Sequence, residues 1–143
     1  MASLTLVSPA LTRRPARSSF GPWLRRVPLA ALFVTTGTLH FLTPEPFVSI
    51  VPDALPAPLA LVYASGIAEI AGGLGLLGRR TAQPAGWFLI ATLLAIFPAN
   101  IGMALNPERH PDIPEALLWV RLPLQAVLIL WIHRVAIRPP HPG

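Results

Sequence analysis

Apolar residues follow one another in four long blocks that few polar residues interrupt. The blocks span residues 23–42, 58–78, 83–105 and 115–137. Each of the last three holds about 20 residues, enough to cross a hydrocarbon core of about 30 Å at about 1.5 Å per residue. The first block is shorter, with an apolar centre at residues 27–42. We expect Trp23 to anchor at the membrane interface, and Arg25 and Arg26 to extend toward it.

The connections after the second and third blocks are short, at residues 79–82 and 106–114. Short turns place consecutive helices side by side in opposite directions. The pattern therefore predicts an all-α integral membrane protein, an up-down bundle of four transmembrane helices over residues 23–137.

The connection at residues 43–57 is longer and differs in composition. It carries four prolines around an apolar stretch at residues 47–51. Proline restricts the backbone, so the apolar stretch is expected either to lie on the membrane surface or to cap the bundle. A stiff connector with no further role explains the same composition equally well.

The two ends of the chain are polar. Residues 1–22 contain serine, proline and arginine without a sustained period, and residues 138–143 form a second short tail. We predict that both tails are cytoplasmic and that the first is disordered. The first apolar block also resembles a signal peptide, but no small-residue cleavage site follows it, so a retained helix is the preferred interpretation.

Composition supports a lipid environment. Apolar residues make up 53% of the chain and charged residues 12%, with a mean hydropathy of +0.60. A soluble domain of this size needs more polar residues to cover its surface. The sequence has no cysteine, which excludes disulfides, thiol redox chemistry and thiolate metal sites within the chain.

The net charge of +5 comes from arginine alone. The arginines flank the apolar blocks, so membrane topology explains them better than nucleic-acid binding. The bias places both termini in the cytoplasm, and the composition indicates the inner membrane of a bacterium. The predicted cytoplasmic side holds Arg13, Arg14, Arg17, Arg25, Arg26, Arg79, Arg80, Arg134 and Arg138; the opposite side holds Glu45, Asp53, Glu108, Asp112 and Glu115, with Arg109.

Five charged, amide or imidazole residues lie deep enough in the predicted helices to be out of place in hydrocarbon. Ionisable groups at membrane depth cost several kcal/mol unless they are paired, so these residues are expected to face the interior of the bundle. Packing and helix register alone are the alternative explanation, preferred for His40, Asn100 and Gln125. The five residues form the candidate ligand-binding cluster: His40, Glu69, Asn100, Arg121 and Gln125.

Glu69 is the most costly of the five because it lies near the middle of its helix. Gln125 has a similar depth, and Arg121 lies one turn from it, so we predict a Glu69–Arg121 ion pair. Small residues around Glu69 predict close contact with another helix. His40 is placed more than 10 Å from Glu69 in depth, and no metal site is predicted.

Two prolines interrupt the predicted helices. Pro98 and Pro123 each leave one carbonyl, of Leu94 and Trp119, without its helical donor. Asn100 and Arg121 lie near these positions and are candidates to donate to the freed carbonyls.

Five segments in order resemble those of small bacterial DoxX-like membrane proteins, over residues 27–137. They are 37–41 (GTLHF), 51–52 (VP), 63–69 (YASGIAE), 97–100 (FPAN) and 121–125 (RLPLQ). The resemblance implies a four-helix membrane fold and an association with membrane oxidoreductases, some relatives being subunits of a thiosulfate:quinone oxidoreductase.

These observations lead to one functional hypothesis and two alternatives. The hypothesis is an accessory subunit of a quinone-linked membrane redox assembly, with a quinone-like cofactor near Glu69 and Arg121. Its partners are the bilayer and membrane oxidoreductase subunits, and no nucleic acid. The first alternative is a small-solute permease or channel, which would require a homo-oligomer to form a pore. The second is a structural assembly factor. No self-sufficient catalytic constellation is evident.

Overall fold

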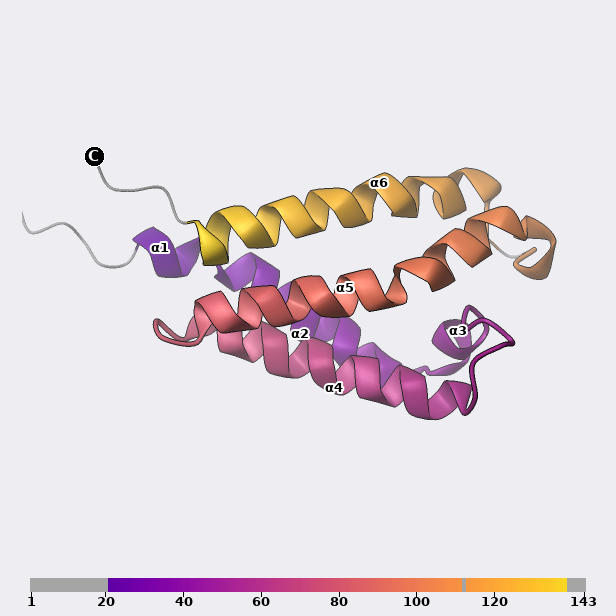
Figure 1. Cartoon of the computed structure of the whole chain (residues 1–143), viewed down its shortest axis with the longest axis horizontal. Helices are drawn as coiled ribbons and strands as arrows, with labels where there is room; N and C mark the ends of the chain where they lie inside the picture. The colour runs from indigo at the N-terminus through magenta and orange to yellow at the C-terminus, as the bar shows by residue number, and fades with distance from the viewer. Residues whose placement is uncertain (1–20, 112, 139–143) are drawn as a thin grey trace, which may run out of the picture.

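A computed structural model describes residues 21–111 and 113–138, and all elements within these ranges are helical (Figure 1). The all-α class predicted from the apolar blocks is therefore confirmed for the described residues. The predicted tails at 1–22 and 138–143 lie almost wholly outside these ranges. The elements are α1 (Gly21–Leu24), α2 (Val27–Leu42), α3 (Glu45–Val48), α4 (Pro58–Leu77), α5 (Ala82–Leu105), a 3-10 turn (Pro107–Arg109), α6 (Glu115–Ile132) and a π-helical turn (His133–Ile137).

Three of the helices are long and apolar enough to cross a membrane: α4, α5, and α6 with the π-helical turn that follows it. The fourth apolar helix, α2, has 16 residues. The predicted block at 23–42 divides into α1 and α2, because Pro28 has no backbone N–H with which to continue a helix from α1. Arg26 instead closes a turn, donating its backbone N–H to the carbonyl of Trp23.

The four long helices lie side by side and alternate in direction (Figure 1). Glycines bring α2 and α4 together most closely. A Cβ on Gly37 would lie 2.7 Å from the carbonyl oxygen of Gly66, and a Cβ on Gly66 would lie 2.8 Å from the Cβ of His40. Any side chain at either position would force the helices apart. The close helix contact that was predicted around Glu69 is therefore present, and it is made with α2.

The apolar core is concentrated at the end of the molecule where α1 and the π-helical turn lie. It joins the start of α2 and of α5 to the ends of α4 and α6. Arg26 is buried in the same end and donates from Nε to the carbonyl of Val135 at 3.2 Å, so it does not extend outward as expected. The core residues are Leu29, Ala30, Phe33, Leu76, Leu89, Ile90, Leu93, Ile132, Val135 and Ala136.

A smaller apolar cluster closes the opposite end. Met103 and Ala104 from α5 pack there with Leu118 from α6, and Ile50 from the long connection packs against them. In the same connection, the Phe47 ring stacks on the His40 ring with centroids 3.9 Å apart. Of the two explanations for residues 43–57, the structure therefore favours a cap over the helices. We call residues 43–57 the capping segment.

Candidate functional site

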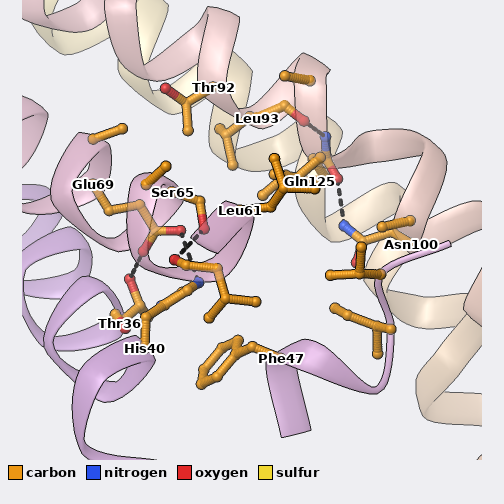
Figure 2. Close-up of a pocket in the computed structure, with 18 of the residues that line it drawn as sticks. Thr36, His40, Phe47, Leu61, Ser65, Glu69, Thr92, Leu93, Asn100 and Gln125 are labelled. Atoms are coloured by element: carbon orange, nitrogen blue, oxygen red, sulfur yellow. Dashed lines mark hydrogen bonds and ion pairs between the residues drawn. The ribbon is translucent and has the colours of Figure 1, made fainter. Parts of the chain in front are cut away.

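All five residues of the predicted polar cluster line one cavity of about 520 Å³, which lies between the two apolar clusters. Figure 2 shows four of them, with Glu69 and His40 on one wall and Asn100 and Gln125 on the other. Every long helix and the capping segment contribute to the lining. The predicted interior position holds for His40, Glu69 and Gln125, which are buried, and for Asn100, which is half-buried; Arg121 lines the cavity but is exposed.

The first wall consists of a hydrogen-bonded group on α2 and α4. Thr36 donates from Oγ1 to Glu69 Oε2 at 2.5 Å, and Glu69 Oε1 lies 3.9 Å from His40 Nε2. His40 Nδ1 lies 2.7 Å from the backbone carbonyl of Thr36. The side chains of His40 and Glu69 are 8% and 7% exposed, so the carboxylate has almost no contact with solvent. The groups that offset the cost of burying this carboxylate are Thr36 and His40, and both belong to α2.

The predicted ion pair between Glu69 and Arg121 is not formed. Arg121 directs its Nη1 toward Met103 Sδ at 3.0 Å, and its side chain is exposed. The ion pairs among the described residues are His40–Glu69 and Asp53–Arg109. The prediction failed because similar depth does not bring two helices together, and the cavity separates this part of α4 from α6.

The predicted separation of His40 and Glu69 by more than 10 Å is also wrong. That estimate places the end of α2 level with the start of α4. In the structure α2 ends early, with Gly37 opposite Gly66, and the capping segment continues beyond it. This offset brings His40 level with Glu69. The described residues contain no group of three side chains able to hold a metal ion.

The second wall consists of two amides on α5 and α6. Asn100 donates from Nδ2 to Gln125 Oε1 at 2.7 Å, and Gln125 donates from Nε2 to the backbone carbonyl of Leu93 at 2.6 Å. A donor was expected for the carbonyl that Pro98 frees, at Leu94, from Asn100 or Arg121. That contact is not observed: Asn100 donates to Gln125 and Arg121 to Met103, while Gln125 donates to the carbonyl of Leu93, one residue before Leu94.

A family model described as Domain of unknown function (DUF8561) matches residues 29–136. The chain belongs to this family. Comparison with curated proteins and with solved structures gives no match. The family segment contains both polar walls, the capping segment and all of the core residues named above, so the cavity lies within the family domain.

The remainder of the cavity in this DUF8561 domain is mostly apolar. Its volume lies in the range typical of small-molecule sites, which combine apolar walls with a few placed polar groups. Exposed residues line it on three helices, Ala64 on α4, Ala95 on α5 and Leu124 on α6, so it reaches the side of the helices. It is therefore suited to an amphiphilic molecule with a polar headgroup.

Sequence reasoning missed two contributors to this cavity. Thr36 is not among the predicted site residues, yet its hydroxyl donates a hydrogen bond to Glu69. The four-residue spacing between Thr36 and His40 was the available signal. Phe47 gave no signal of its own, because an apolar residue in a connection fits a packing role as well as a lining role.

Proposed function

We propose that this chain is a four-helix integral membrane protein that binds a quinone-like amphiphile in its cavity. We further propose that it serves as an accessory subunit of a membrane redox assembly, in the inner membrane of a bacterium. The observation that carries the binding proposal is the mostly apolar cavity with hydrogen-bonding groups on two opposite walls. A quinone headgroup is a flat ring with oxygen atoms at two opposite ends, which matches two polar walls separated by apolar surface.

Charge distribution supports the membrane orientation, with both termini in the cytoplasm. Except for Arg109, the described arginines outside the cavity lie just after α1, in the α4–α5 turn, and in or just after the π-helical turn, at one end of the molecule (Figure 1). The carboxylates Glu45, Asp53, Glu108 and Glu115 belong to the opposite end. Such a bias orients membrane proteins with the arginine-rich end inside.

Access to the cavity supports a lipid-soluble ligand. The exposed lining residues Ala64, Ala95 and Leu124 lie within long apolar helices and not at their ends. In the proposed orientation this opening faces the hydrocarbon, from which a quinone would diffuse in. A permease needs a path through both sides, and the apolar core around Leu29, Leu76 and Ile132 fills the cytoplasmic end of the helices.

The link to a redox assembly rests on the DoxX-like resemblance of the cavity-lining segments. The motifs that carry it include His40, Glu69, Asn100, Arg121 and Gln125, which are the residues around the cavity. The resemblance is therefore concentrated where a ligand would bind, and this favours a shared ligand class over a shared scaffold alone.

The test is to purify the full chain in mild detergent, extract it with organic solvent and quantify quinone per protein. Ala99→Phe fills the cavity, while Ala91→Phe places the same ring on the exposed side of α5, outside the lining. We expect near-stoichiometric quinone with the wild type and Ala91→Phe, and little with Ala99→Phe. Wild-type protein that neither carries quinone nor binds added decylubiquinone would refute ligand binding. Absence of oxidoreductase subunits from the purified complex would refute the accessory role.

A further inference from the structure

The gap between His40 and Glu69 has a specific size. His40 Nε2 and Glu69 Oε1 are 3.9 Å apart, which exceeds the distance of a direct hydrogen bond. An oxygen atom between them can lie about 2.8 Å from each, within the usual range for both partners. Polar groups at such a separation are commonly bridged by a third group.

The hydrogen bond that His40 makes on the side away from Glu69 indicates which of its ring nitrogens carries a hydrogen. The Thr36 carbonyl can only accept, so His40 Nδ1 carries a hydrogen and donates it. In a neutral imidazole Nε2 then has a lone pair, which faces the carboxylate oxygen across the gap. Two acceptors that face each other in a buried site are unfavourable, so the pair either shares one proton, on Nε2 or Oε1, or takes a hydrogen from the group that fills the gap.

A hydroxyl group matches this gap better than a carbonyl group. With one proton on the pair, one side donates and the other accepts. A hydroxyl oxygen accepts from the first and donates its own hydrogen to the second, so both are satisfied. A carbonyl or ether oxygen accepts only, and would leave the other acceptor without a partner at a cost in affinity.

We infer that the His40–Glu69 gap is a hydroxyl-recognition site, and that the cavity prefers a lipophilic ligand bearing a ring hydroxyl over its carbonyl or ether counterpart. This inference rests on the proposed ligand binding and adds the redox state of the ligand. For a quinone-type molecule, the reduced hydroquinone is the preferred form.

The surroundings of the pair support recognition of a ring. Phe47 stacks on the His40 imidazole at an interplanar angle of 22°, which fixes the plane of the imidazole at the cavity wall. Across the cavity, the amides of Asn100 and Gln125 can both donate and accept, so they impose no preference on the second oxygen of the ligand. Arg121 is the further ionisable group in the lining, and it is engaged with Met103. Selection between oxidised and reduced forms thus depends on His40 and Glu69.

The experiment compares three probes on the full chain in nanodiscs under anaerobic conditions: decyl hydroquinone, its dimethyl ether and the corresponding decyl quinone. We expect the hydroquinone to bind about tenfold or more tightly than the other two, as hydrogen bonds to charged groups imply. This comparison needs no variant. In Glu69→Gln and His40→Phe the preference should fall to about twofold or less, while Glu115→Gln, an exposed carboxylate at the start of α6, should retain it.

The outcomes distinguish a failure of hydroxyl recognition from a failure of the proposed ligand binding. Equal binding of all three probes to the wild type, lost in Ala99→Phe, would overturn hydroxyl recognition and leave the ligand site in place. A preference that survives in both Glu69→Gln and His40→Phe would also overturn it. Failure of all three probes to bind would overturn both.

Discussion

Gly37 and Gly66 lie against each other where α2 crosses α4, and their contact brings His40 level with Glu69. A Cβ on Gly37 would approach the Gly66 carbonyl oxygen to 2.7 Å, and a Cβ on Gly66 would approach the Gly37 carbonyl oxygen to 2.9 Å. The contact is therefore backbone to backbone. Because it lies next to Thr36, His40 and Glu69, the first polar wall depends on a helix spacing that only glycine permits.

Substitution at this contact should be destabilising. Gly66→Ala places a methyl group within 3 Å of Gly37 and His40, and overpacking of this kind costs about 1–3 kcal/mol. Gly102→Ala is the matched control, because a Cβ there meets nothing within 4 Å, and it should stabilise α5 by up to about 1 kcal/mol. Unfolding in mixed micelles with increasing SDS measures both. Equal stability of the two variants would contradict the close contact.

The second wall makes a prediction about unsatisfied polar groups. Gln125→Leu has similar volume but removes the donor to the Leu93 carbonyl and the acceptor for Asn100. Leaving buried polar groups unpaired costs about 1–3 kcal/mol, so this variant should unfold at lower SDS than the wild type.

A double variant tests whether the loss comes from those groups. Adding Asn100→Leu to Gln125→Leu removes the orphaned amide, and the pair should recover part of the lost stability. If the second substitution instead adds its full cost to the first, the two amides are not coupled, and the hydrogen bond between them does not contribute.

The sequence predicted the helices and the polar residues that line the cavity well, but it predicted poorly which side chains these residues contact. The long apolar blocks determined α4, α5 and α6 because chain length and hydropathy alone distinguish such helices. Polar residues inside them had to face inward, which located the cavity. The partner of Glu69 was missed because a helical sequence gives the depth and face of a residue but not its neighbouring helix. The offset of α2, created by Gly37 and the capping segment, places His40 instead of Arg121 beside Glu69.

The capping segment is tied to the α5–α6 connection by an exposed ion pair. Arg109 donates from both Nη1 and Nη2 to Asp53 Oδ2 at 3.0 Å, with 61% of the arginine and 80% of the aspartate side chain exposed. Exposed pairs contribute about 1 kcal/mol or less, so Asp53→Asn should barely change global stability. It should increase amide hydrogen exchange in residues 43–57, and added salt should produce the same increase in the wild type. Unchanged exchange would show that Phe47 and Ile50 hold the segment by themselves.

Orientation in the membrane can be measured directly because the sequence has no cysteine. Gln83→Cys places a thiol at the start of α5, and Pro111→Cys places one in the α5–α6 connection, both at exposed positions that leave every charge unchanged. The arginine-rich end is expected inside. An impermeant maleimide should therefore label Pro111→Cys in spheroplasts and Gln83→Cys only after the membrane is permeabilised. The reverse pattern would place both termini outside, and labelling of both thiols in spheroplasts would contradict a membrane-spanning α5.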